Sequence, residues 1–316
     1  MIQTKGLVKR YGSFTAVDGI DLNIPRGQIY GFLGPNGAGK TSTIMMLLGI
    51  TRPTAGEIRL LGEPYTPRRL DLRRRIGVVP EKHPRGVWPW MTAREYLGLF
   101  ADLFEVPSAP QRIDMLLEKV DLASVANKRF CEYSRGMLQK LSIVRALLPD
   151  PDILFLDEPI SGLDPLGIKQ VRDLIVSENR EGRTIFISSH QLSEMERICH
   201  RVAIIFRGRL MVEDTMRSLL SRITAEREVR VELEAPPADL VVRVKNLRFV
   251  RDASEQGGTL IVKVSKEGDH RKALSEFLIR QGQVPLSITE KIPSLEEAFI
   301  TITQENIVML MRGGAE

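Results

Sequence analysis

The chain has 316 residues, 43% of them apolar and 27% charged, which excludes a disordered or collagen-like protein and allows two globular domains. Its 45 Lys and Arg against 40 Asp and Glu leave a charge of +5, too diluted to indicate a nucleic-acid groove by itself. Cys131 and Cys199 form no CxxC or Cys/His cluster, so neither a disulfide framework nor a zinc site is indicated and a reducing cytosol fits best. With no apolar signal segment at the start and no apolar run near ~18 residues, we expect any membrane association to come through a partner.

The first 65 residues alternate short β-like runs with turn residues. Residues 20–24 and 29–33 read as two strands joined by a turn at Pro25, Arg26 and Gly27, and the second strand leads into a glycine-rich loop. Residues 40–48 favour a helix, which Gly49 is placed to end.

Helical periodicity dominates from about residue 88 to 149. Apolar residues recur at steps of three and four in two stretches, which predicts a helical insertion: Tyr96, Leu99, Phe100 and Leu103, then Ile113, Leu116, Leu117 and Val120. Three later runs, 153–156, 184–187 and 202–206, have the character of buried parallel strands, with helix-like stretches before the second and third. This alternation predicts an open α/β sheet, whose ligands bind beyond the carboxyl ends of the strands.

The character of the chain changes again after about residue 220. A charged stretch and Pro236-Pro237 precede strand candidates at 229–233 and 260–264 and a helix candidate at 271–280. We place a boundary at about 218–228, which divides the chain into residues 1–220, with the helical subdomain at about 88–149, and a small α+β domain at 221–316.

Residues 34–41 match the pattern GxxxxGK[ST], after a predicted strand and before a predicted helix. Glycines let successive backbone N–H groups turn toward phosphate oxygens, and the helix N-terminus favours an anion. Lys40 would reach the β- and γ-phosphates and Thr41 would bind Mg²⁺. The alternative is a glycine-rich turn in which Lys40 is a solvated cap.

An apolar strand ends in two adjacent carboxylates, Asp157 and Glu158. Burying both without a cation is costly, so they favour a metal–phosphate centre. Asp157 would bind Mg²⁺ and Glu158 would orient or deprotonate the water that attacks the γ-phosphate. His190 follows another strand and is placed to contact the γ-phosphate, although a histidine at a strand end is more often structural.

Two more motifs carry a family resemblance. Residues 133–140 read YSRGMLQK and lie between the phosphate loop and the carboxylates, and residues 161–164 read SGLD and follow them. With these four motifs in order, residues 1–220 resemble the ATPase subunit of an ABC transporter. The fold class this implies is α/β, a P-loop NTPase with an N-terminal antiparallel β subdomain, a helical insertion and the small C-terminal domain.

The resemblance implies roles for individual residues, with ATP and Mg²⁺ as cofactors. Lys40, Glu158 and His190 would be catalytic, Thr41, Asp157 and Glu81 would bind the metal, and Tyr11 would stack on adenine. Glu81 and Asp164 would couple the site to a partner. The nucleotide would be held by Tyr11, Gly34, Pro35, Asn36, Gly37, Ala38, Gly39, Lys40, Thr41 and Ser42, and in trans, from a second copy, by the signature residues Ser134, Arg135, Gly136 and Met137.

The signature and Glu81 depart from the family pattern. Arg135 and Met137 replace residues of the consensus SGGQ, whereas Ser134 remains a possible N-cap of an apolar-striped helix, which would equally suit a helix packed on its own core. Glu81 stands where the family has glutamine, so it would add charge beside Asp157 and Glu158. We hypothesise that Glu81 makes metal binding more dependent on pH.

Basic and aromatic runs flank Glu81. The arginines at 68, 69, 73, 74 and 75 are either a solvated helix face or a contact for anionic lipid or an acidic partner segment. Trp88 and Trp90 lie where the family's helical insertion flanks the groove for a permease, and we expect one of them to be exposed. Residues 293–299 are similar to a closing motif of exporter-type ABC subunits.

These observations predict an ATP-hydrolysing subunit that forms a homodimer or heterodimer and powers a separately encoded polytopic membrane permease. We expect this permease to be an exporter. We expect the subunit in the cytoplasm, held at the inner face of the membrane by that permease, and we expect no nucleic-acid partner. The alternatives are a soluble ABC ATPase that remodels ribosomes or DNA, and a nucleotide sensor that does not hydrolyse ATP. Family members of the first class usually carry two ATPase domains or a coiled-coil insertion, and the second is disfavoured by Glu158 and His190.

Overall fold

The computed structural model describes residues 1–66, 68–81, 89–223, 227–234, 236–237, 239–265, 268–291 and 294–313, without the side chains of 222–223 and 305–313. The chain divides into two compact units, Met1–Met216 with Ile302–Glu316, and Arg217–Thr301. The first unit thus ends slightly before the expected boundary, and it includes the end of the chain, which the sequence pattern assigned to the C-terminal domain.

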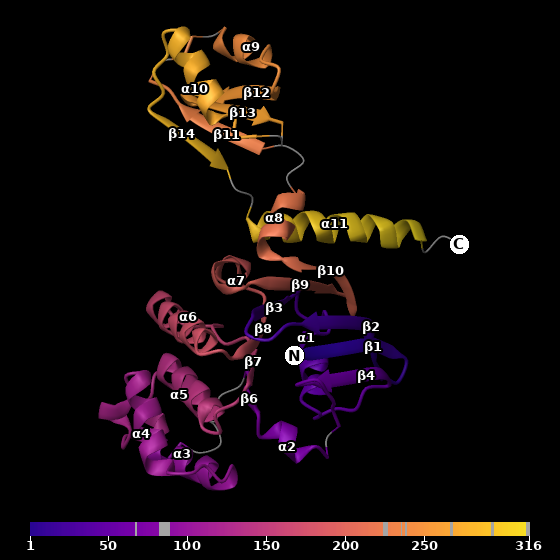
Figure 1. Ribbon diagram of the computed structural model, residues 1–316, viewed down its shortest axis with the longest axis vertical. Coiled ribbons are helices and arrows are strands. Elements are labelled where there is room, and N and C mark those ends of the chain that lie inside the picture. Colours follow the sequence, from indigo (N-terminus) through magenta and orange to yellow (C-terminus); the bar gives the residue numbers. More distant parts are fainter. Residues whose placement is uncertain are drawn as a thin grey trace. The chain divides into compact units, whose positions relative to one another are not determined.

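The N-terminal part of the first unit is an antiparallel sheet in the order β2-β1-β4-β5 (Figure 1). Its strands are β1 (Ile2–Tyr11), β2 (Phe14–Ile24), β4 (Ala55–Leu60) and β5 (Glu63–Pro64). In β1 and β2, buried residues alternate with exposed ones over much of the length, as expected where one face packs on a core.

The second sheet of this unit has six strands in the order β10-β9-β3-β8-β7-β6. They are β3 (Ile29–Leu33), β6 (Ile76–Val79), β7 (Ile153–Asp157), β8 (Thr184–Ser189), β9 (Arg201–Phe206) and β10 (Arg209–Thr215). Neighbouring strands pair in parallel except β10, which is antiparallel to β9. Because helices and the other sheet cover both faces, β3 and β8 are buried along their whole length.

Helices separate and cover the sheets. Helix α1 (Lys40–Leu47) contacts β2 and β7, between the two sheets, and the core continues from one sheet to the other around it. The other face of the six-stranded sheet is covered by α5 (Arg135–Leu147), α6 (Pro165–Arg180) and α7 (Leu192–Ile198) (Figure 1). The short α2 (Leu70–Arg73) precedes β6.

The predicted helical insertion is present as α3 (Ala93–Leu103), α4 (Ala109–Lys119), two 3-10 turns (Ala123–Val125 and Phe130–Glu132) and α5. The apolar stripe of α4 is buried as its period predicts. The stripe of α3 is not, because Tyr96 is buried whereas Leu99 and Leu103 are exposed. One part of this stripe therefore faces the surface.

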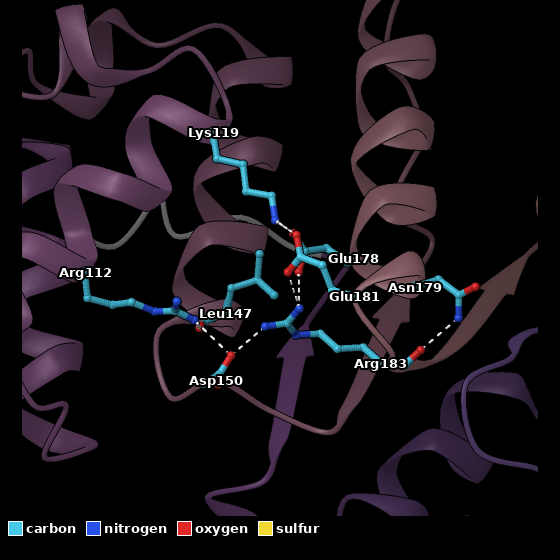
Figure 2. A network of polar contacts seen from close by, with 8 residues as sticks. All are labelled: Arg112, Lys119, Leu147, Asp150, Glu178, Asn179, Glu181 and Arg183. Carbon is cyan, nitrogen blue, oxygen red and sulfur yellow. Dashed lines mark hydrogen bonds and ion pairs between the residues drawn. The ribbon is translucent and has the colours of Figure 1, made fainter.

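A network of ion pairs ties the helical insertion to the sheet (Figure 2). Glu178 of α6 is only 1% exposed, and its carboxylate pairs with Lys119 of α4 at 2.5 Å and with Arg183 at 2.9 Å. Arg183 also pairs with Asp150, to which Arg112 of α4 binds from the other side at 3.2 Å. Arg183 thus connects α4 with the start of β8.

The second unit has the order β11-α9-β12-β13-α10-β14 and a sheet in the order β12-β13-β11-β14, the split βαβ arrangement of ferredoxin-like folds. Its elements are β11 (Arg227–Glu232), α9 (Leu240–Lys245), β12 (Val250–Gln256), β13 (Thr259–Val264), α10 (Arg271–Arg280) and β14 (Ser287–Lys291). Buried residues of α9 and α10 share one core with β11 and β13. This unit combines helices and strands in one core, and its fold implies no function by itself.

Two helices span the boundary between the units in sequence, α8 (Met216–Ile223) and α11 (Leu295–Gly313). The start of α11 explains part of the closing motif at 293–299. The Ser294 hydroxyl accepts a hydrogen bond from the Glu297 amide, and the Glu297 carboxylate accepts one from the Ser294 amide. This capping box fixes where the helix begins, with Leu295 and Ala298 buried. Pro293 lies outside the described residues.

Candidate active site

Four neighbouring parallel strands end at one edge of the six-stranded sheet and bring the predicted site together. The phosphate loop follows β3, His190 follows β8, Asp157 and Glu158 end β7, and Glu81 comes after β6. At this edge lies a cavity of about 380 Å³, within the usual range for small-molecule sites. Its walls are Phe14, Ala16, Pro35, Asn36, Gly37, Gly39, Lys40, Thr41, Ser42, Glu81, Asp157, Glu158, Ser161 and His190.

The phosphate loop lies so close to neighbouring backbone that two of its glycines have no room for a side chain. A Cβ at Gly39 would come within 2.5 Å of the Ala16 carbonyl oxygen, and the φ of Gly39 is +107°. A Cβ at Gly34 would come within 2.4 Å of the Ile205 carbonyl oxygen. Glycine at both positions lets the loop pack on β2 and β9 and start α1.

Lys40 lies over this loop. Its ammonium donates hydrogen bonds to the carbonyl oxygens of Gly34 at 2.7 Å and Pro35 at 3.3 Å. It also lies 3.7 Å from a carboxylate oxygen of Glu158. These contacts fix a buried positive charge beside the loop amides and the helix N-terminus, where an anion is favoured.

The two carboxylates are held in different ways. The hydroxyl of Ser188 on β8 donates a short hydrogen bond to Asp157. The backbone amide of Glu158 donates to the Ser188 carbonyl at 3.1 Å, and its carboxylate lies 2.9 Å from His190 Nδ1. Glu158 has a φ of +49°, a left-handed backbone conformation that is costly for a residue with a side chain.

Burial, together with the nearby carboxylates of Glu81 and Glu158, raises the pKa of Asp157. A divalent cation would relieve this cost, because it favours the charged form of the carboxylates. Among the described residues no group of three or more His, Cys, Asp and Glu could hold a metal alone. Oxygen donors from Thr41 and Asp157 nevertheless suit Mg²⁺, which takes its other ligands from phosphate and water.

Several residues with roles implied by the resemblance do not line this cavity, among them Gly34 and Ala38 of the phosphate loop, Tyr11 and Asp164. Tyr11 lies at the end of β1 and Asp164 at the start of α6, where its carboxylate accepts a hydrogen bond from the Gly167 amide at 2.7 Å. Asp164 is therefore the N-cap of α6, and Pro165 occupies the first helical position. Glu81 does line the cavity, beside Asp157.

The signature residues lie at the start of α5. The hydroxyl of Ser134 accepts a hydrogen bond from the Met137 amide at 3.2 Å, so the predicted N-cap is present. The Arg135 guanidinium lies against Gly162, where an added Cβ would come within 2.2 Å of it. This contact links the signature segment to the loop at 161–164.

Sequence reasoning gave no site role to four residues that lie at the site: Phe14, Ala16, Ser161 and Ser188. Ser188 is buried, and two serines at the end of an otherwise apolar strand were the available signal. Phe14 and Ala16 carried none, because their place depends on how β2 packs against the phosphate loop.

The basic and aromatic runs around Glu81 are only partly described. Trp90 is 63% exposed, as expected for one of the two tryptophans, and Trp88 lies outside the described residues. Three arginines of the basic run are paired within the chain, Arg69 with Asp71, Arg74 with Glu105 and Arg75 with Asp152. The run thus behaves largely as a solvated, internally paired surface.

Comparisons with known proteins show the family of this chain. Residues 17–161 match the ABC transporter family. The chain is similar to the bacitracin transport ATP-binding protein BcrA of Bacillus licheniformis, with 38% identity over 303 residues that cover 96% of this chain and 97% of that protein. It is also similar to the Nod factor export ATP-binding protein I of Burkholderia pseudomallei, with 37% identity over 93% of this chain and 94% of that protein.

Solved structures give the same result. An ATP-binding subunit of an ABC transporter matches with a TM-score of 0.64 and 28% identity, over 70% of this chain and 92% of its own. A bacterial ABC transporter cassette with a dimeric structure matches with a TM-score of 0.61 and 25% identity, over 68% of this chain and 99% of its own. No helix in the described part of the chain has the length and apolar character to cross a membrane. The chain therefore belongs to the ATP-binding subunits of ABC transporters, a family of ATPases.

Proposed function

We propose that this chain hydrolyses Mg·ATP in the cavity at the strand ends and thereby powers a membrane permease that exports its substrate. The convergence of the phosphate loop, Asp157, Glu158 and His190 on one cavity carries the proposal. Export is supported by the relatives, since one is named for bacitracin transport and another for Nod factor export.

The phosphate loop and Lys40 bind the triphosphate, and Thr41 and Asp157 hold Mg²⁺, with Glu81 close by. When bound, the metal neutralises charge that develops on the phosphates. Positioning and electrostatics then account for most of the catalysis, as in other phosphoryl transfers.

Glu158 orients the attacking water and accepts its proton. Its carboxylate lies between Lys40 and His190, at 3.7 Å and 2.9 Å, so it is fixed from two sides. The strained backbone of Glu158 and the hydrogen bond from its amide to Ser188 aim it from the end of β7 into the cavity. His190 is placed to steady the γ-phosphate from the neighbouring strand.

The complete site is proposed to form between two copies, identical or different. The capped start of α5 would meet the nucleotide that the other copy holds, since helix N-termini favour anions. The solved relative with a dimeric structure supports this arrangement.

The permease is proposed to bind the groove between α3 and the sheet. A hollow of about 600 Å³ lies there, bordered by Leu70, Phe100, Leu103, Arg73 and Arg74 among others. Leu70 and Leu103 are exposed, and exposed apolar side chains rimmed by charges are typical of interfaces. The exposed Trp90 precedes the start of α3.

Affinity purification of the full chain from detergent-solubilised cells tests this proposal. We expect a polytopic membrane protein to co-purify with the wild type and to be lost from Leu103→Asp and weakened for Trp90→Ala. Met115→Ala, which truncates an exposed side chain on α4, is the matched control, and nucleotide binding should be intact in all three. Co-purification of ribosomal RNA or DNA instead would support the nucleic-acid alternative.

Glu81→Gln tests the metal assignment. Removing this negative charge from the cavity should raise the Mg²⁺ concentration needed for half-maximal ATP hydrolysis, because carboxylates bind Mg²⁺ better than amides do. An unchanged Mg²⁺ dependence would remove Glu81 from the metal site and leave Thr41 and Asp157 in place.

A further inference from the structure

A second cavity, of about 630 Å³, lies beside the N-terminal antiparallel sheet and shares no lining residue with the nucleotide cavity. Three segments form its lining: the end of α1 with the loop after it, strand β4, and the residues that follow β5. Its volume is in the usual range of ligand-binding clefts. The apolar part of the lining consists of Met46, Pro53, Ala55, Ile58, Pro64 and Tyr65.

This cavity is also basic. Arg52, Arg59 and Arg68 line it, one from each of the three segments, and all three are exposed. Arg59 donates a hydrogen bond to the Gly62 carbonyl at 2.9 Å. Within the described ranges of the chain, none of the three guanidinium groups has a carboxylate partner. Each of them is therefore available to a carboxylate from outside the chain.

Other charges around the cavity are matched. Glu57, the carboxylate of the described lining, stands opposite Lys5 where β1 pairs with β4, so the two are cross-strand neighbours. Three arginines of the nearby basic run are bound to carboxylates, Arg69 at 2.7 Å, Arg74 at 2.8 Å and Arg75 at 2.6 Å. Unmatched positive charge is thus gathered at the cavity, where it favours an anionic partner.

Strand β4 has a free edge along this cavity. One side of β4 pairs with β1. On the other side β5 pairs only with Arg59 and Leu60, and the Tyr65 amide donates a hydrogen bond to the Ile58 carbonyl at 2.9 Å. No strand of the described residues covers 55–57 on that side. An unpaired strand edge is a template to which an extended peptide can add.

We propose that this cavity binds an extended, acidic segment of the permease, which adds to the free edge of β4. The inference rests on the proposed function, because it requires a permease partner. The backbone of the segment pairs with β4, and its carboxylates meet the three arginines, whose planar guanidinium groups suit carboxylates. An anionic lipid headgroup would use the arginines but would leave the strand edge unpaired, so the geometry favours a peptide.

The cavity adjoins the groove proposed for the permease. Arg68 lies two residues before α2, and Leu70 and Arg73 of α2 border that groove. The two binding surfaces therefore flank one short helix, and a single partner can contact both.

Affinity purification of the full chain from detergent-solubilised cells tests the charges. The arginine variant combines Arg52→Gln, Arg59→Gln and Arg68→Gln. At physiological salt it should retain about tenfold less permease than the wild type, the combined effect of three exposed ion pairs. Added salt should lower the wild-type yield toward that of the variant. The matched control removes three exposed cations from helices elsewhere, Lys169→Gln, Arg180→Gln and Lys272→Gln, and should keep the wild-type yield. Nucleotide binding should be unchanged in both.

Two measurements on the full chain with its permease identify the occupant. Photo-crosslinking from Thr66→p-benzoylphenylalanine, which replaces an exposed residue of the lining, should label an acidic segment of the permease, mapped by mass spectrometry. Amide hydrogen exchange of residues 55–57 should be slower in the purified complex than in the chain alone, because strand pairing protects backbone amides.

Three results would overturn the inference alone: equal permease yields from the arginine variant and its control, crosslinks confined to lipid or to a second copy of the chain, or unchanged exchange of residues 55–57. A wild-type chain that retains no membrane protein would overturn the proposed function as well.

Discussion

The two units place their charged residues differently. At the active edge of the first unit, Glu81, Asp157 and Glu158 face one cavity, and Lys40 lies 3.7 Å from Glu158. In the second unit, carboxylates are matched with arginines close by, such as Asp239 with Arg243, Asp269 with Arg271 and Glu290 with Arg227.

Sheet topology explains this difference. Parallel strands end together, so loops from β3, β6, β7 and β8 meet at one edge and gather polar groups there. The antiparallel strands of the second unit place successive loops at opposite ends, and pairs such as Asp269 with Arg271 form within one short segment. We therefore expect charge substitutions at the active edge to affect chemistry, those in the Glu178–Arg183 network to affect the stability of the first unit, and those in the second unit to affect local stability only.

The largest effect is expected at the ion-pair network of Figure 2. Arg183→Met would leave the buried Glu178 with Lys119 alone and should lower the free energy of unfolding of the first unit by about 3 kcal/mol. Arg183→Met combined with Glu178→Met should recover much of this loss, because no unpaired buried charge remains. Urea denaturation measures both, and exposed Arg180→Met is the control. Equal stability of Arg183→Met and the control would show that this ion-pair network does not stabilise the contact between the helical insertion and the sheet.

A smaller effect is expected for Ser188→Ala, which removes the hydroxyl that binds Asp157. The rate of ATP hydrolysis should fall about tenfold, the cost of one misplaced charge-assisted hydrogen bond, with little change in stability. Ser142→Ala removes a buried hydroxyl of α5 that donates only to the Leu138 carbonyl, and it should keep the wild-type rate. If both variants had the same turnover, Ser188 would not organise the carboxylates.

The smallest effect is expected for Arg227→Met in the second unit. Its guanidinium lowers the pKa of Glu290. The pair therefore stabilises the unit above about pH 4.3, the usual pKa of Glu, and this contribution is lost as the pH falls through the lower folded pKa. Hydrogen exchange of β11 and β14 should show a loss of at most about 1 kcal/mol at pH 7 that shrinks below pH 4, with ATP turnover unchanged. A difference that persisted at low pH would mean that Arg227 acts through packing.

Local sequence patterns predicted much of the fold and the chemical centre. The phosphate loop, the ends of β7 and β8 and the bounds of α10 follow from periodicity and turn residues, because these are properties of neighbouring residues. The capping box at Ser294 shows that part of a family motif can be a helix start signal.

Features that depend on distant pairing were not predictable. Ser188 reaches Asp157 only because β7 and β8 are adjacent, and Phe14 lines the cavity only because β2 packs against the phosphate loop. Leu103 matches the helical period but borders a surface groove. The end of α11 belongs to the first unit, although no change in composition marks the point where the chain returns to it.

The most direct test of the central claim uses Glu158→Gln with ATP and Mg²⁺. This variant keeps the phosphate loop and the metal donors but lacks the group that accepts a proton from water, so it should bind ATP without turnover. Size-exclusion chromatography with light scattering should then show a dimer that retains nucleotide in every copy. A chain that remains monomeric and retains none would contradict an ATP site shared between two copies.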